Sequence, residues 1–375
     1  MENLKEKKFA LFMNPYSSLK AWDENGTFTK EIRLYKKLAE EFQALYIFSY
    51  GDKRDQEYAK SLPKNITIIP KPGWLPNSLY EMLLPFLHWQ IVQSCDIFKT
   101  NQNAGALAPA IAKIIFRKKF IVRSGYIGSE FARLGKMSLP AKIYFWAVEN
   151  ISYRLADQVF IPGTDAGTLL KKYPFLKDKL VIMNNAIDTD LFKKIEVEKK
   201  YDIVYQARLD GIQKNHRGLL EAIDGLHLKL LLIGKGQEKE NIIREASERK
   251  IDLTLLERVP NEELPALYNS AKICVFPSFF EGNPKSLLEC MSCELPVAAF
   301  AVPGVANLIE NEKSGLLSEP NNRLLKKNIQ RLLENPTLGA SLGKEARQHI
   351  LENFSFSNLL QKEIEIYNGL TGQKL

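Results

Sequence analysis

The feature that most constrains this chain is a repeated alternation of short apolar runs with stretches of helical periodicity. In the first half, strand-like runs occupy residues 8–13, 44–50, 66–69, 97–100 and 120–123, and helical stretches occupy 29–42 and 105–116. Strands that alternate with helices favour a parallel sheet with helices on both faces. We therefore predict an α/β fold of the doubly wound kind.

The alternation restarts after a Lys/Glu-rich segment at residues 193–200. The predicted strands of this second series are residues 202–207, 228–234, 252–256, 273–277 and 297–300. Such a restart indicates a domain boundary, and 375 residues are more than one core commonly supports. We predict an N-terminal domain at residues 1–194, a C-terminal domain at 195–354, and a helix at 355–375 that packs back on the N-terminal domain.

The charge balance favours anionic partners. The net charge of +8 suits phosphorylated ligands, lipid headgroups or nucleic acid. The sequence shows no basic ribbon with interleaved aromatic residues and no recognisable reading helix, so a nucleic-acid-binding protein is only an alternative.

The cysteines predict a reducing compartment. All four lie in apolar context, where a free thiol packs as a small hydrophobe: Cys95, Cys274, Cys290 and Cys293. The N-terminal segment carries charges of both signs and an apolar run too short for a signal peptide. Together these features predict a cytoplasmic protein.

The most informative motif is FPSFFEGNPKSLLECM at residues 276–291, which runs from a predicted strand into a predicted helix. Asn283 is predicted to cap this helix, with Pro284 at its first position. A helix that starts at the carboxyl end of a parallel strand binds anions readily. Glu281 precedes the helix and Glu289 lies inside it, so one acid can reach sugar hydroxyls and the other a ribose diol.

This motif resembles the E-x7-E signature of family 4 glycosyltransferases of the GT-B fold, with Glu281 and Glu289 at its acidic positions. Upstream, VYQARLDGIQKNHRGLL at residues 204–220 resembles the first strand and loop of the family's C-terminal domain. Arg208 and Lys214 match the two cations that hold the donor diphosphate in that family. The resemblance is strong over 201–317, partial over 157–192, and fades in the first 150 residues.

The resemblance implies a GT-B enzyme with two doubly wound parallel-sheet domains facing across a cleft. Its activity would be the retaining transfer of a hexose from a nucleotide diphosphate sugar to a glycan, lipid-linked or other acceptor, with no metal required. The implied catalytic residues are Arg208, Lys214 and Glu281. The implied donor-binding residues are Glu289, Gly282, Asn283, Pro284, Lys285, Ser286, Leu287 and Val259.

Three alternatives stay open beside this interpretation. A nucleotide-sugar epimerase of the same fold would convert the donor without an acceptor. The pair Asp188 and Asp190 could hold a metal in another glycosyltransferase fold, although the neighbouring sequence predicts that these acids cap turns. The apolar stretch at 74–89, with basic residues at Lys113 and 117–119, is predicted as a core helix, and peripheral membrane contact is the alternative.

Overall fold

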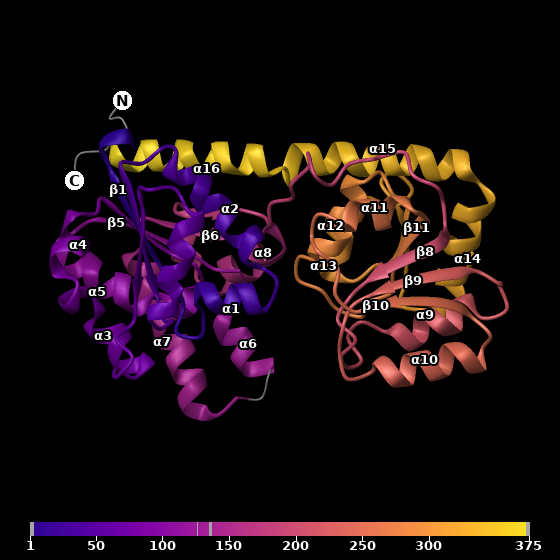
Figure 1. Ribbon diagram of the computed structural model, residues 1–375, viewed down its shortest axis with the longest axis horizontal. Helices are drawn as coiled ribbons and strands as arrows, with labels where there is room; N and C mark the ends of the chain where they lie inside the picture. The colour runs from indigo at the N-terminus through magenta and orange to yellow at the C-terminus, as the bar shows by residue number, and fades with distance from the viewer. Residues whose placement is uncertain (1–3, 126, 135–136, 373–375) are drawn as a thin grey trace. The chain divides into compact units, whose positions relative to one another are not determined.

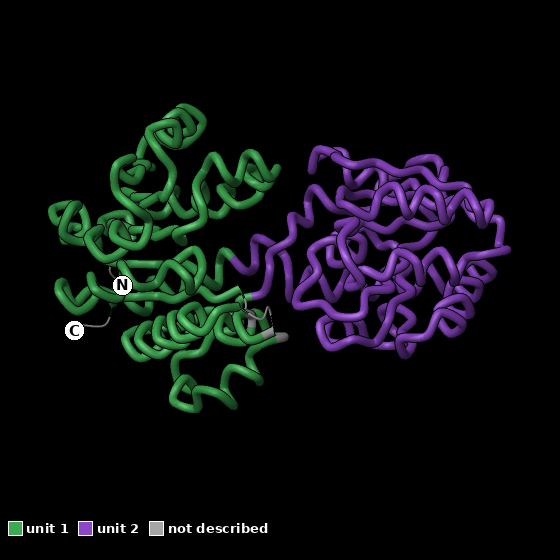
Figure 2. The backbone as a smooth tube through the Cα atoms, turned by 90° about the horizontal axis from the view of Figure 1, so that it is seen from below, with its two compact units in different colours: residues 1–183, 360–375 green, residues 184–359 purple. Residues whose placement is uncertain are grey.

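The computed structural model describes residues 4–125, 127–134 and 137–372, which form two compact units (Figures 1 and 2). Unit 1 comprises Met1–Met183 and Leu360–Leu375, and unit 2 comprises Asn184–Leu359. Each unit is an α/β structure built around one parallel sheet.

Unit 1 contains a seven-stranded sheet of order β3-β2-β1-β4-β5-β6-β7. Its strands are β1 (Lys8–Phe12), β2 (Ala44–Ser49), β3 (Ile66–Pro70), β4 (Ile97–Thr100), β5 (Lys119–Arg123), β6 (Gln158–Ile161) and β7 (Leu180–Ile182). Its helices are α1 (Leu19–Glu24), α2 (Phe28–Ala39), α3 (Asn77–Leu87), α4 (Trp89–Ser94), α5 (Leu107–Phe116), α6 (Gly128–Leu134), α7 (Leu139–Leu155) and α8 (Gly163–Lys172). The central strand β1 is buried because it pairs with β2 on one side and β4 on the other.

Unit 2 contains a six-stranded sheet of order β10-β9-β8-β11-β12-β13. Its strands are β8 (Tyr201–Gln206), β9 (Lys229–Ile233), β10 (Asp252–Leu256), β11 (Ala271–Phe276), β12 (Val297–Phe300) and β13 (Leu316–Ser318). Its helices are α9 (His216–Ile223), α10 (Lys239–Glu248), α11 (Leu264–Asn269), α12 (Lys285–Ser292), α13 (Pro303–Ala306), α14 (Asn322–Glu334) and α15 (Pro336–Asn353). The strand order reverses between β8 and β11, so the loops that follow these two strands lie side by side.

The last helix, α16 (Phe356–Thr371), contributes to the core of unit 1. Tyr367 is fully buried and its ring contacts Phe9 and Phe42. Glu363 forms an ion pair with Lys99 of β4, and both side chains are almost completely buried. Burial lowers the pKa of Lys99, and the carboxylate of Glu363 acts in the opposite direction.

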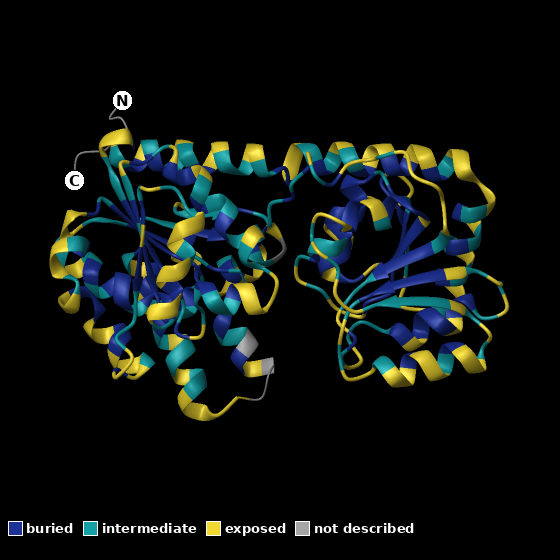
Figure 3. Cartoon of the chain, viewed as in Figure 1, coloured by how far each residue is buried: buried dark blue, intermediate teal, exposed yellow. Residues whose placement is uncertain are grey.

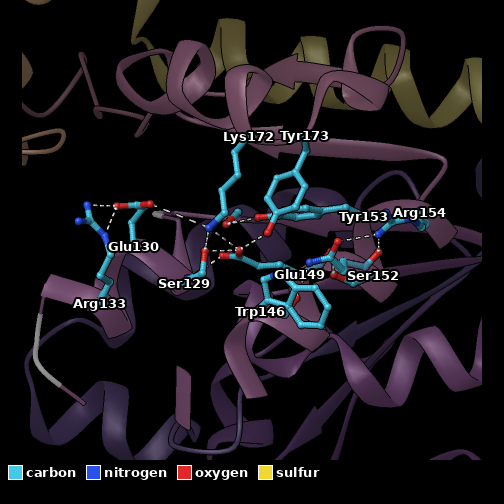
Figure 4. A network of polar contacts seen from close by, with 12 residues as sticks. Ser129, Glu130, Arg133, Trp146, Glu149, Ser152, Tyr153, Arg154, Lys172 and Tyr173 are labelled. Atoms are coloured by element: carbon cyan, nitrogen blue, oxygen red, sulfur yellow. Dashed lines mark hydrogen bonds and ion pairs between the residues drawn. The ribbon is translucent and has the colours of Figure 1, made fainter. Parts of the chain in front are cut away.

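A buried carboxylate organises another part of unit 1 (Figure 4). Glu149 of α7 accepts hydrogen bonds from the Ser129 backbone amide at 2.9 Å and from the Tyr173 hydroxyl at 2.8 Å. Lys172 Nζ lies 3.8 Å from the same carboxylate. Because these partners come from α6 and from the end of α8, Glu149 fixes the packing of both against α7.

The core-helix interpretation of the 74–89 stretch is wrong for one face of α3. Tyr80, Leu84 and Pro85 are buried, whereas the following apolar side chains are exposed: Leu79, Met82, Leu83, Phe86 and Leu87 (Figure 3). The stretch was predicted to be interior because apolar runs of this length usually are, but only the side of α3 that carries Tyr80 and Leu84 packs into the core of unit 1, where α5 lies against it. Within the described ranges, no helix has the length and hydropathy needed to span a bilayer.

Candidate functional site

The candidate site in unit 2 is built from the loops that follow β8 and β11. The Phe279 amide donates to the Gln213 carbonyl at 2.9 Å, and the Gln213 side chain donates to the Phe280 carbonyl at 2.9 Å. Asn215 Nδ2 donates to the Pro277 carbonyl at 3.2 Å. These bonds join the two loops at the point in the sheet where ligands of open α/β folds commonly bind.

The joined loops bring Lys214 and Glu281 together. Lys214 Nζ lies 2.6 Å from Glu281 Oε1, and the two side chains are only 15% and 7% exposed. The backbone behind Lys214 is held by Tyr205, whose hydroxyl donates to the Lys214 carbonyl at 2.9 Å and lies 3.0 Å from Ser278 Oγ. A largely buried, charge-assisted contact of this length holds both groups in defined positions.

Arg208 occupies a different environment on the same loop. Its side chain is 74% exposed, and its guanidinium lies 3.9 Å from Asp210. In the described parts of the chain, no ion pair joins it to Glu281. The structure thus brings one of the two predicted cations to the acid, and leaves the other in solvent.

The helix after Glu281 starts one residue later than predicted. α12 begins at Lys285, and Pro284 is its N-cap residue with extended backbone (ψ 106°) and no side-chain cap. The predicted cap at Asn283 is therefore wrong. Pro284 has an extended backbone, so the helix begins after it, and the Asn283 side chain bonds to no amide of the described helix. Ser286 Oγ donates to the Gln206 carbonyl at 3.0 Å, which fixes the start of α12 against the end of β8. Leu287 is buried beneath this first turn.

The side-chain amide of Asn283 is buried without a hydrogen-bond partner in the described structure. Both its Oδ1 and its Nδ2 are buried and make no hydrogen bond within the described structure. Its backbone carbonyl accepts from Asn185 Nδ2 at 3.2 Å, which fixes the residue in place. Buried amide groups are almost always hydrogen-bonded in native proteins. A polar ligand beside Gly282 and Asn283 would supply those bonds.

Glu289 lies deeper than the other candidates. It is 3% exposed, and the Tyr268 hydroxyl donates to Glu289 Oε2 at 3.0 Å. The same hydroxyl contacts Gln206 Oε1 at the end of β8. Burial raises the pKa of Tyr268 well above its ordinary value, so this hydroxyl remains a donor at neutral pH.

The remaining donor-site candidate, Val259, lies apart from these residues. It is half-buried in the segment after β10, and β10 is separated from β8 by β9. The structure gives no hydrogen bond that ties this segment to Lys214 or Glu281 within the described chain.

Three glycines allow the loops of the site to pack closely. A Cβ atom on Gly304 would lie 2.1 Å from the Glu281 carbonyl oxygen. Gly234 and Gly236 pack in the same way against residues 207–210, with Cβ positions 1.9 Å and 2.2 Å from the nearest atoms. A glycine inside an apolar strand-to-helix turn was the available signal, since it often marks close backbone approach.

Asp188 and Asp190 form a turn. Asp188 Oδ1 accepts from the backbone amides of Asp190 and Leu191 at 3.3 Å and 3.2 Å, as the turn-capping prediction requires. The described residues contain no group of three or more potential metal ligands. All four cysteines are free and buried, which confirms their predicted role in packing.

Comparison with known proteins finds a matching family model and similar curated proteins. Residues 187–349 match the family model described as glycosyl transferases group 1. O-antigen chain mannosyltransferase B of Escherichia coli is 28% identical over 41% of this chain and 45% of its own length. Poly(ribitol-phosphate) alpha-N-acetylglucosaminyltransferase of Staphylococcus aureus is 27% identical over 38% of this chain and 29% of its own. The chain thus spans less than half the length of these curated relatives.

Solved structures resemble the whole chain. Anabaena HepE in complex with UDP has a TM-score of 0.77 at 16% identity, covering 97% of this chain and 100% of that one. Sucrose-phosphate synthase from Thermosynechococcus elongatus has a TM-score of 0.73 at 18% identity, covering 98% and 99%. At these identities the likeness concerns the fold, and it confirms the predicted architecture of two parallel-sheet α/β domains.

Proposed function

Because this chain belongs to the glycosyl transferases group 1 (GT4) family and has the GT-B fold, we propose that it is a retaining hexosyltransferase that uses a nucleoside diphosphate sugar as donor. The acceptor would be a hydroxyl of a glycan, a lipid-linked sugar or a related molecule. The buried thiols suit a reducing compartment, and we place the reaction in the cytoplasm.

The contact between Lys214 and Glu281 carries this proposal. A leaving nucleoside diphosphate accumulates negative charge, and a fixed cation nearby stabilises it. Lys214 is held at the edge of the sheet where the first turn of α12 begins, and the amides of a first helical turn have no acceptor within their own helix. A diphosphate at this place would meet both the ammonium and the start of the helix.

Five of the predicted residues then have a part in binding the donor. Lys214 and the solvent-exposed Arg208 would neutralise the diphosphate, and Glu281 would orient the donor sugar through its hydroxyls. Asn283 would use its unpartnered amide on the same ligand, and Glu289 would face the ribose. UDP, the ligand named for the Anabaena structure, is the natural first nucleotide to test.

Retention follows if the acceptor attacks from the side of the leaving group. The bond between the anomeric carbon and the diphosphate oxygen breaks, and the bond to the acceptor oxygen forms on the same face of the sugar. The departing phosphate oxygen takes the acceptor's proton. The protein contributes charge stabilisation and positioning.

The deciding experiment compares Lys214→Ala with Lys344→Ala, an exposed lysine on α15. We expect Lys214→Ala to lower kcat with a UDP-sugar donor by about a hundredfold or more, because a charge-stabilising group is lost. Lys344→Ala should behave like the wild type. Equal activity of the two variants would remove Lys214 from the mechanism, and donor conversion without any acceptor would favour the epimerase.

A further inference from the structure

The outward face of α3 carries no charged side chain. Its exposed residues are Ser78 and the five apolar side chains named above, and the exposed Trp89 continues this surface into α4. Met82 and Phe86 are 53% and 52% exposed. Surface helices of soluble proteins usually turn charged residues to solvent, so an uncharged apolar face of this size indicates an interaction surface.

A second apolar stripe lies on α7 of the same unit. Leu139, Ile143 and Trp146 follow helical spacing and are all more than half exposed. α5 packs against both α3 and α7, and Tyr144 of α7 donates to the Glu81 carboxylate of α3 at 3.0 Å. Ile114, near the end of α5, is also exposed. We call this set of exposed side chains on α3, α4, α5 and α7 the apolar face.

The segment that forms the apolar face is strongly basic. Residues 71–156 contain eleven Lys and Arg but only four Asp and Glu, in a chain whose net charge is +8. Of these four acids, Glu81 and Glu149 are buried, and Asp96 is half-buried and accepts from the Lys8 amide. Arg117 is exposed at the end of α5, where Lys118 and Lys119 follow it. Lys99 is buried and Lys113 pairs with Asp157. Arg117, Lys118, Lys119 and Lys142 are at least partly exposed, with almost no exposed acid in the segment to offset their charge.

We propose that the apolar face of unit 1 binds the surface of an anionic lipid bilayer. Tryptophan, phenylalanine and leucine would enter the boundary between headgroups and acyl chains, and the flanking lysines and arginines would pair with lipid phosphates. A second copy of this chain fits less well, because two such basic faces would repel each other. This binding is independent of the donor chemistry proposed for unit 2.

The test is co-sedimentation of the full chain with vesicles of phosphatidylcholine alone, or of phosphatidylcholine and phosphatidylglycerol in equal amounts. Met82→Gln/Phe86→Gln removes apolar side chains, and Lys118→Gln/Lys142→Gln removes charge. Ile243→Gln/Leu324→Gln is the matched control, since both residues are exposed apolar positions on helices of unit 2.

The wild type and the control should bind the mixed vesicles, and binding should weaken as salt is raised. The apolar variant should lose at least about tenfold in affinity, and the charge variant should lose about tenfold with mixed vesicles but little with phosphatidylcholine. Unchanged thermal midpoints and UDP binding would show that all variants fold.

Three results would overturn the proposal. One is wild-type protein that stays in the supernatant with both vesicles. Another is equal binding by the wild type and both test variants. The third is a wild-type dimer in light scattering that Met82→Gln/Phe86→Gln converts to a monomer, which would make the apolar face a self-association surface.

Discussion

The two predicted cations differ in how the protein holds them. Lys214 is anchored through its carbonyl and its ammonium group, whereas Arg208 extends into solvent near Asp210. An anchored lysine has already lost its conformational freedom before a ligand arrives, but an exposed arginine loses it only on binding. Lys214 is therefore suited to a fixed role in the site. Arg208 is suited to moving onto the ligand when it binds.

Arg208→Ala should therefore separate activity from stability. We expect an unchanged thermal midpoint, because the side chain is mostly in solvent. We also expect kcat to fall by about a hundredfold if the guanidinium stabilises the leaving diphosphate. Steady-state kinetics and a thermal melt on the same preparation check both parts. Wild-type kcat would rule out the assigned role.

Sequence reasoning could name candidate site residues only where they lie in a recognisable motif. Lys214 and Glu281 are 67 residues apart, and the resemblance selected both before the structure placed them in contact. The burial of Asn283, the solvent exposure of Arg208 and the close packing around Gly304 depend on which loops meet in space. The spacing of residues in the sequence does not show which loops contact each other. The roles of all these residues stay predictions.

At the scale of elements, the loop after β11 packs directly against the start of α13. Gly304 lies at the start of α13 and leaves no room for a side chain beneath the Glu281 carbonyl. Gly304→Ala should push this loop outward and destabilise unit 2 by about 1–3 kcal/mol. Gly282→Ala is the matched stability control, because its Cβ would meet nothing within 4 Å. Chemical denaturation should separate the two variants, and equal unfolding free energies would contradict the packing argument.

The contact between α3, α5 and α7 gives unit 1 a pH dependence. Burial raises the pKa of Glu81 to about 7 from its ordinary 4.5, although a hydrogen bond from Tyr144 opposes the shift. Between these values the folded chain keeps a proton that the unfolded chain has released, so the unfolding free energy falls as pH rises. Above pH 7 the unfolding free energy stays lower by the full amount that this pKa shift sets.

Glu81→Gln removes the titrating carboxyl group, so this variant should not lose unfolding free energy as the pH rises. We expect it to match the wild type near pH 4.5 and to exceed it by roughly 1–3 kcal/mol at pH 8. Urea denaturation at the two pH values measures the difference directly. A difference that does not change with pH would show that Glu81 titrates normally.

Elements with buried apolar runs could be predicted well from the sequence. The strand at 252–256 agrees with β10, and the one at 297–300 agrees with β12. β6 was missed although it is apolar, and the three-residue strands β7 and β13 were missed because such short runs carry little pattern. The apolar stretch of α3 was misjudged for a different reason: hydrophobicity alone does not tell whether a second layer covers a helix.

At the scale of the whole molecule, the ion pair between Lys99 and Glu363 ties α16 to unit 1. Removing one buried charge leaves the other without compensation, so Lys99→Met should destabilise unit 1 by about 3–5 kcal/mol. The double variant Lys99→Met/Glu363→Leu should recover most of that loss, because a buried pair can be replaced by apolar side chains. Thermal unfolding of both variants checks this, and a double variant no more stable than the single one would contradict it.

The placement of α16 also affects how the protein emerges from the ribosome. Phe9 and Tyr367 share one core, yet the whole of unit 2 is translated between them. Domains commonly fold in the order of their synthesis, but here the sheet of unit 1 has to wait for a helix that is made after unit 2. During that interval the positions of Tyr367 and Glu363 in the core of unit 1 stay unfilled, so we expect nascent unit 1 to expose apolar surface until α16 has been made.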